Sequence, residues 1–328
     1  MGMTVDARIL HALRNTNRHL APSEVASLAE ITAAELAVRI AGLNAAGYEI
    51  ELQPHLGYRL IAAPDRLIAD DLTAMLSGVR LAREILVFHE TGSTNDVAMR
   101  LGRNGALEGL VVFAEHQTAG RGRLGRKWQS ASHKGLWFSL LLRPSMPYAD
   151  WARLTTWAAV GIARALERVL RGHKAAIKWP NDVYLGGRKA VGILLESAST
   201  GPSGFAVAGI GVNVNHTRED FPEEIAHRAT SLREIAGEPL DRQSVAAAIL
   251  RELDALYWHI DTGFHAIVAE AEHRSCILGH WIEVNGIHGA ISGQAEALEP
   301  DGSLRIRCSD GRSLVVSGGE VTVTSVRD

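Results

Sequence analysis

The chain has 328 residues, of which 46% are hydrophobic and 22% are charged, as is typical of a globular protein with two or three domains. A net charge of −3 excludes a uniformly basic nucleic-acid binder, so any anion site must be local. Two cysteines without a C-x-x-C motif argue against a disulfide framework and a thiolate zinc site. Because no signal peptide and no bilayer-length apolar run occurs, we expect a cytoplasmic protein.

Residues 1–64 predict three short helices followed by a β-hairpin. Apolar residues recur at helical spacing in 5–13, and further helices are expected near 22–29 and 32–46. Thr32 and Glu35 form a capping-box pattern, and the segment "YEIELQPHLGYRLI" alternates as a hairpin does. This order is typical of a winged helix-turn-helix domain, and the alternative is a small helical cap with a hairpin.

DNA contacts by this domain would fall on its second motif helix, at Thr32 and Arg39. That helix carries no other cation. Over residues 1–64 the five arginines are Arg8, Arg14, Arg18, Arg39 and Arg59, and the six acids are Asp6, Glu24, Glu30, Glu35, Glu49 and Glu51. Because duplex binding depends on Lys and Arg contacts to phosphates, the monomer is expected to bind DNA weakly.

The rest of the chain predicts an α+β fold in two further domains. Strand-like runs dominate from about 85 to 235, interrupted by one helix near 151–171, and two helices are expected over 242–275. From residue 280 the chain has short strands with turn signals at Asn285-Gly286, Asp301-Gly302 and Asp310-Gly311. We therefore expect a mixed-sheet α/β domain over 65–277 and a small SH3-like β-barrel over 278–328.

The segment "GRGRLGRKW" (120–128) has two competing interpretations. Its G-x-G-x-x-G spacing matches a dinucleotide-binding turn, but that turn must open a helix, and Ser and Gly breakers follow here. As a flexible loop, its glycines permit positive φ and close backbone approach, while its arginines match phosphate or carboxylate. We favour an anion-binding loop over the dinucleotide turn, and over a merely solvated basic loop.

Three further stretches carry candidate site residues. Lys178 stands late in an apolar strand, where its ammonium needs an anion unless the side chain merely extends to solvent. Ser93, Thr94 and Asn95 either cap a helix or bind a neutral polar ligand at its start. Lys189 follows a hairpin turn, and Asn213 ends a strand. The 14 histidines show no metal-ligand spacing, so no protein-held metal is expected.

Together these stretches resemble the biotin protein ligases. The motifs "GSTND", "EHQTAGRGRLGRKW", "KWPNDVYL", "RKAVGILLE" and "GIGVNVN" stand in the family's order and at its separations. With the winged-helix start and the SH3-like end, the resemblance covers nearly the whole chain and is to the regulator-type members. It implies a catalytic domain of the biotin/lipoate ligase type, which is similar to class II synthetases.

The resemblance implies a two-step reaction. The carboxylate of biotin attacks the α-phosphate of ATP to give biotinyl-5′-AMP and pyrophosphate, with magnesium arriving on ATP. A lysine of a biotin carboxyl carrier protein then attacks the mixed anhydride. Such chemistry depends mainly on charge stabilisation and positioning.

The implied roles fall into four sets. The biotin head group is assigned to Ser93, Thr94, Asn95 and Gln117. The loop over carboxylate and phosphate is assigned to Arg121, Gly122 and Arg123, and the developing charge to Lys178 with Arg123. The nucleotide side is assigned to Asn181, Lys189 and Asn213. Regulator-type members also imply operator DNA and a homodimer formed on adenylate binding. The competing functions are a lipoate ligase and a non-enzymatic ligand-sensing regulator.

Overall fold

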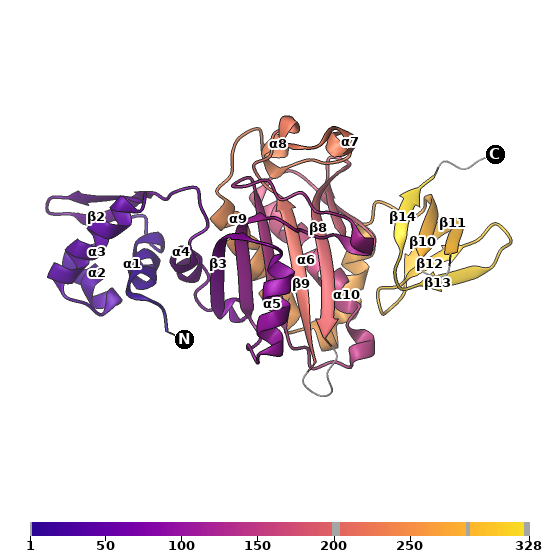
Figure 1. Ribbon diagram of the computed structural model, residues 1–328, viewed down its shortest axis with the longest axis horizontal. Coiled ribbons are helices and arrows are strands. Elements are labelled where there is room, and N and C mark those ends of the chain that lie inside the picture. Colours follow the sequence, from indigo (N-terminus) through magenta and orange to yellow (C-terminus); the bar gives the residue numbers. More distant parts are fainter. Residues whose placement is uncertain (1, 199–203, 287–288, 325–328) are drawn as a thin grey trace.

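The computed structural model describes residues 2–198, 204–286 and 289–324, which form three units along one axis (Figure 1). An N-terminal unit and a C-terminal unit lie at opposite ends, and a seven-stranded sheet with its helices lies between them. The expectation of an α+β fold with a central mixed sheet is confirmed. The domain limits at 64 and 277 stay predictions.

The N-terminal unit consists of three helices and a hairpin, as the sequence predicts. Its helices are α1 (Val5–Arg14), α2 (Pro22–Ala29) and α3 (Ala33–Ala45), and its strands are β1 (Glu49–Gln53) and β2 (Gly57–Ala62), paired antiparallel. Apolar side chains from all three helices, including Leu10, Val25 and Leu36, form a separate buried core. Helix α4 (Ala69–Met75) then leads to the central unit and packs against α1.

The central sheet has the strand order β3-β4-β5-β9-β8-β7-β6. Its strands are β3 (Glu84–Thr91), β4 (Leu110–Gln117), β5 (Gly135–Leu142), β6 (Ala175–Lys178), β7 (Asp182–Leu185), β8 (Arg188–Ala198) and β9 (Phe205–Asn213). Only β3 and β4 pair in parallel, and the other neighbours pair antiparallel. Because parallel strands end at the same edge, Thr91 and Gln117 lie side by side, next to the start of α5 (Thr94–Arg103).

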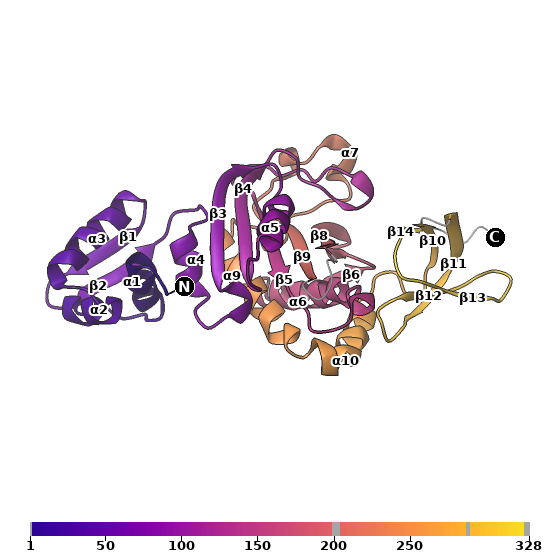
Figure 2. The same ribbon diagram turned by 60° about the horizontal axis from the view of Figure 1, so that its bottom comes forward.

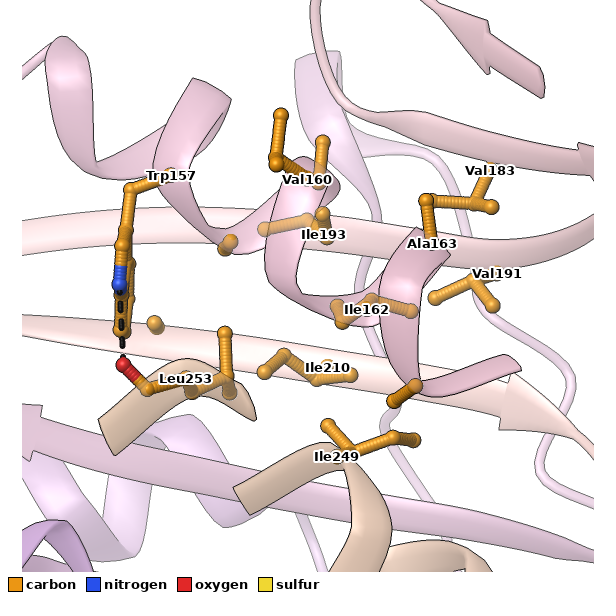
Figure 3. Close-up of a cluster of buried hydrophobic side chains, with 14 of the residues drawn as sticks. Trp157, Val160, Ile162, Ala163, Val183, Val191, Ile193, Ile210, Ile249 and Leu253 are labelled. Carbon is orange, nitrogen blue, oxygen red and sulfur yellow. Dashed lines mark hydrogen bonds between the residues drawn. The ribbon is translucent and has the colours of Figure 1, made fainter. Parts of the chain in front are cut away.

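Helices cover both faces of this sheet. Helix α5 packs on one face, while α6 (Arg153–Val169) and α9 (Arg242–Tyr257) form the layer on the other. Figure 3 shows Ile162 of α6 and Ile210 of β9 meeting in that layer, where the Trp157 indole N–H donates to the Leu253 carbonyl at 3.1 Å. Helix α10 (Ile260–His273) packs against α6 (Figure 2). The expected helices near 151–171 and over 242–275 are confirmed.

The C-terminal unit is a five-stranded antiparallel sheet in the order β13-β12-β11-β10-β14. Its strands are β10 (Trp281–Gly286), β11 (Gly289–Leu298), β12 (Leu304–Arg307), β13 (Ser313–Val316) and β14 (Glu320–Val323). The predicted turns at Gly302 and Gly311 are confirmed, with φ of 86° and 83°.

Two short helices of the central unit, α7 (Glu223–Ala226) and α8 (Leu232–Ala236), follow β9. Within the described ranges, no helix is long and apolar enough to cross a membrane.

Candidate active site

The start of α5 and the end of β4 form a small polar pocket wall. Ser93, Thr94 and Asn95 are buried. The Thr94 N–H donates to Gln117 Oε1 at 2.8 Å, and Gln117 Nε2 donates to Ser130 Oγ at 3.1 Å. Ser93 holds the N-cap position of α5, but its side chain accepts no helical N–H. The Ser93 hydroxyl is therefore not consumed by capping, which weakens the purely structural interpretation of this residue.

Asn95 joins this wall to the floor of the sheet. Its Oδ1 lies 2.6 Å from Ser139 Oγ of β5, and its Nδ2 donates to Glu196 Oε2 of β8 at 2.6 Å. A Cβ added at Gly209 would lie 2.2 Å from Asn95 Oδ1, so the strand beneath must carry glycine. Neutral donors and acceptors from α5, β4 and β5 thus converge at one place with the Glu196 carboxylate of β8.

The glycines of the 120–127 loop serve different purposes. Of the three, only Gly125 has a positive φ, 72°, and Leu124 beside it also has a positive φ, 55°. Gly120 is needed for close approach instead, since an added Cβ would lie 2.7 Å from the Trp128 carbonyl oxygen. Only one 3₁₀ turn (Arg123–Gly125) forms here. This geometry agrees with the rejection of the dinucleotide-binding turn, and it divides the two expected uses of glycine between Gly125, with positive φ, and Gly120, with close approach.

Arg121 is held by two carboxylates. It forms a bidentate pair with Asp96 of α5 at 2.6 and 2.7 Å and reaches Glu196 at 3.3 Å. The hydrogen bond from Arg121 lowers the pKa of Asp96 below its ordinary value. Bidentate Arg–carboxylate pairs use the geometry that also suits phosphate, so these two acids occupy the guanidinium face that an anionic ligand would need.

The other two loop arginines reach towards the C-terminal unit. Arg123 donates to Asn181 Oδ1 at 3.1 Å and to the Gly319 carbonyl at 3.3 Å, while Arg126 pairs with Glu320. Burial lowers the pKa of Arg123 from its ordinary value. Arg123 has no bonded carboxylate among the described residues, so it offers an anion a guanidinium that is already partly desolvated.

The two candidate lysines lie in different surroundings. Lys189 Nζ is 2.7 Å from Asp182 Oδ1 and 5.4 Å from the centre of the Trp128 ring, which follows the loop. Lys178 Nζ lies 5.8 Å from the centre of the Tyr184 ring. The described contacts bring Lys189 next to Trp128, and a role for Lys178 at the loop stays a prediction.

Trp128 lies over a glycine floor, and the sequence patterns assigned it no role. Gly192 of β8 and Gly211 of β9 are cross-strand partners, and an added Cβ would meet the ring at 2.6 Å and 2.5 Å respectively. The buried indole N–H of Trp128 has no hydrogen-bond partner within the described part of the chain. The signal that could have revealed this arrangement is the pair of glycines in adjacent strands, where no side chain obstructs a flat ring.

Asn213 does not point a free amide into this site. Its Nδ2 donates to the Thr230 carbonyl at 3.1 Å, and the residue is buried. The amide thereby holds the segment before α8 against the end of β9. A direct nucleotide contact by Asn213 stays a prediction, and the observed hydrogen bond gives the residue a positioning role.

Several polar residues of the site were not predicted. They are Asp96, Ser130, Ser139, Asp182 and Glu196, which contact the predicted residues directly. Asp96, Asp182 and Glu196 stand within quoted motifs, whereas Ser139 lies in a strand whose faces depend on pairing register. Over residues 2–198, 204–286 and 289–324, no group of three His, Cys, Asp or Glu side chains is placed to hold a metal ion.

Comparisons with known proteins test the resemblance carried by the motifs. Residues 87–213 match the Biotin/lipoate A/B protein ligase family. The chain is 35% identical to the bifunctional ligase/repressor BirA of Bacillus subtilis over 84% of this chain and 85% of that protein. It is 34% identical to the biotin–[acetyl-CoA-carboxylase] ligase of Mycobacterium tuberculosis, over 78% and 94%.

Among solved structures, the biotin protein ligase from Aquifex aeolicus in complex with biotin and ATP is similar, with a TM-score of 0.65 and 31% identity. The match covers 74% of this chain and 99% of that one. The chain therefore belongs to the biotin protein ligase family.

Proposed function

We propose that this protein activates biotin with ATP and transfers it to a lysine of a biotin carboxyl carrier protein. The observation that carries the proposal is the adjacency of two sites of different polarity. A neutral hydrogen-bonding wall at Thr94, Asn95 and Gln117 lies beside a loop whose Arg121 meets carboxylates. Biotin has a neutral ureido head group and an anionic carboxylate, so it matches this division.

Biotin would bind with its head group against Ser93, Thr94, Asn95 and Gln117. The fused rings lack a charge, which suits donors and acceptors that are buried and already ordered by one another. Its carboxylate would then reach Arg121, where it competes with Asp96 and Glu196 for the guanidinium. Gly122, whose N–H bonds the Arg126 carbonyl at 2.7 Å, keeps the loop narrow at that point.

In the first step a biotin carboxylate oxygen forms a bond to the α-phosphorus of ATP, and the bond to pyrophosphate breaks. Negative charge on the α-phosphate oxygens must be stabilised as the two anions approach. Arg123 and Lys189 would do this. Arg123 lies in the loop and pairs with no carboxylate among the described residues, and Lys189 lies beside Trp128 in an ion pair with Asp182, with which an incoming phosphate must compete. Lys178 stays a predicted contributor on the basis of the family motif.

The nucleotide would lie on the Trp128 side of the site. The flat ring of Trp128 packs on Gly192 and Gly211, with Lys189 beside it and Asn181 bonded to Arg123 of the loop. We propose that magnesium enters bound to ATP phosphate oxygens and water, with no protein ligand set of its own, as is common for this hard cation. It would neutralise phosphate charge during the transfer.

In the second step a lysine amine of the carrier attacks the acyl carbon of the adenylate. The C–N bond forms, AMP leaves, and the amine loses a proton. No side chain needs to form a covalent bond, so the protein contributes orientation and charge.

Isotope exchange between pyrophosphate and ATP tests the first step. We expect exchange that requires biotin, and no exchange when lipoate replaces it. Exchange with lipoate would favour the lipoate ligase, and exchange with neither acid would favour the ligand-sensing regulator. Mass spectrometry of a carrier domain after incubation tests the second step.

We also propose that the N-terminal unit is a winged helix-turn-helix and the C-terminal unit an SH3-like barrel. The order of α2, α3 and the β1–β2 hairpin supports the first, and the five-stranded antiparallel sheet supports the second. Thr32, however, accepts the Glu35 N–H as a helix cap, and Arg39 lies 3.6 Å from Asp6. Operator binding would then need an adenylate-induced homodimer, which doubles the phosphate contacts.

A further inference from the structure

A buried polar network leads from the N-terminal unit into the central sheet. Asp71 of α4 is fully buried, and its carboxylate accepts hydrogen bonds from Arg14 of α1 at 2.5 and 2.6 Å. Tyr48 donates to the same carboxylate at 3.1 Å, and so does Gln243 of α9 at 3.0 Å. One carboxylate thus ties together the N-terminal unit, the linker helix and a helix of the central unit.

The second buried carboxylate of the network is Glu115 of β4. Arg242, the neighbour of Gln243, pairs with Glu115 at 2.5 Å, and only about 1% of the Arg242 side chain is exposed. The linker joins here as well, since Arg242 reaches Asp65 at 3.0 Å and the Leu67 N–H donates to Glu115 Oε1 at 2.7 Å. We call the set Arg14, Asp71, Gln243, Arg242 and Glu115 the interdomain network.

The network ends beside the proposed biotin pocket. Glu115 precedes Gln117 by two residues on the same strand, and its Oε2 lies 3.3 Å from His133 Nδ1. His133 belongs to the segment that also carries Ser130, the partner of the Gln117 side chain. A displacement of Glu115 would therefore reach the pocket by two routes, along β4 and through residues 130–133.

Because its carboxylates are buried, we expect the contacts of this network to break together rather than one at a time. A buried carboxylate that loses its partners keeps its desolvation penalty, so partial opening is costly. The N-terminal unit therefore cannot tilt without breaking the contacts of Asp71, and the linker cannot shift without disturbing Glu115. A contiguous chain of such contacts can couple two sites.

We propose that Asp71, Arg242 and Glu115 are positioning residues for biotin binding, and that they make the N-terminal unit a contributor to the affinity of the pocket. This inference rests on the proposed function, because it takes biotin as the ligand of Thr94, Asn95 and Gln117. By reciprocity, biotin must also tighten the linker when it binds.

Hydrogen exchange on the wild-type chain tests the reciprocal effect without any variant. We expect biotin to slow exchange at 93–95, which is the pocket, and also at Leu67 and Ile68, whose N–H groups donate to Glu115 and Gln243. Slowing at the pocket alone would overturn the coupling. No slowing anywhere, with no biotin binding by calorimetry, would instead contradict the proposed function.

Arg14→Gln tests the direct effect, because Arg14 contacts Asp71 but lies in the N-terminal unit. We expect its biotin Kd to rise about 3- to 30-fold, the range found for mutations along coupling networks, with kcat at saturating biotin nearly unchanged. Arg14→Lys should restore part of the affinity. If the glutamine variant does not fold, the lysine variant and the exchange experiment still decide the question.

Arg164→Gln is the matched control. Arg164 also joins two elements through a partly buried carboxylate, Glu270, but that pair connects α6 to α10 and does not touch the interdomain network. Its biotin Kd should stay within twofold of the wild-type value. Equal effects of Arg14→Gln and Arg164→Gln would show a general loss of stability and would overturn the inference.

Discussion

The 120–127 loop and the interdomain network use the same Arg–carboxylate chemistry in opposite surroundings. In the loop, the side chains of Arg126 and Glu320 are 60% and 35% exposed. In the network, those of Arg242 and Glu115 are 1% and 5% exposed. Exposed pairs contribute little to stability and can exchange partners, whereas a buried pair is costly to break. The first arrangement suits a binding loop whose ion pairs must exchange partners when an anionic ligand binds. The second suits a permanent contact between two units.

Stability measurements give the largest expected contrast. Arg242→Met leaves Glu115 buried without its main partner, so we expect the free energy of unfolding to fall by about 3–5 kcal/mol. Arg126→Met removes an exposed pair and should cost less than about 1 kcal/mol. Urea unfolding of both variants measures the two values. Similar losses in the free energy of unfolding would contradict the distinction between the loop and the interdomain network.

His216 adds a third case, a buried titratable group without a charge partner. It stacks on Phe221 and its Nδ1 lacks a hydrogen-bond partner among the described residues. Burial lowers the pKa of His216 to about 4, opposed in part by Asp220. The folded-state pKa lies below the unfolded value of about 6.5, so the unfolded chain binds more protons between these values.

Stability should therefore decline as pH falls from about 6.5 to about 4, by up to about 3 kcal/mol from this residue. His216→Phe should flatten that part of the curve, as measured by urea unfolding at pH 7.5 and pH 5. An unchanged pH dependence in the variant would show that His216 does not titrate in this window.

Kinetics can sharpen the account of the loop. Lys189→Ala should reduce biotin-dependent pyrophosphate exchange about 100-fold or more, equivalent to about 2.7 kcal/mol, because it removes a preorganised charge at the reacting phosphate. Lys178→Ala should have a smaller effect, and Lys174→Ala, which is exposed, should have none. The reverse order for the first two would return the main role to Lys178, as the family resemblance implies.

Helix α3 extends the comparison to a surface that lacks the loop's charge. Its exposed residues include Ala34, Ala37 and Val38, and its single arginine is engaged by Asp6 and Glu35. We expect the full chain to bind its own promoter DNA about tenfold more tightly with biotin and ATP present than without them. Ala37→Arg should raise the magnitude of the salt slope by about one. Equal binding with and without ligands would remove the need for a ligand-induced dimer.

Local patterns predicted most of the fold. Alternation and helical spacing identified the strands of the central sheet and the helices α6, α9 and α10, and Asp-Gly pairs marked the turns of the C-terminal unit. The loop and the start of α5 were predicted from residue types that bind anions and neutral polar groups. Each of these signals lies within a short stretch of the chain, so a single sequence is enough to detect it.

Residues that depend on pairing register could not be predicted in this way. Glu196 and Ser139 reach Asn95 only because β8 and β5 present particular faces, and a shift of one residue would reverse them. Trp128 acquires its floor from two strands that are adjacent only after folding. Asp71 and Arg242 carry no local signal of their contacts, because burial is a property of the assembled units.

Asp71 has a consequence for how such proteins change over evolutionary time. A descendant that lost residues 1–64 would keep this carboxylate while losing the two partners, Arg14 and Tyr48, that supply three of its four described hydrogen bonds. Selection would then favour a neutral side chain at position 71, or loss of α4 itself. Loss of the N-terminal unit is thus linked to a compensating change outside it, and natural single-domain descendants should carry that change.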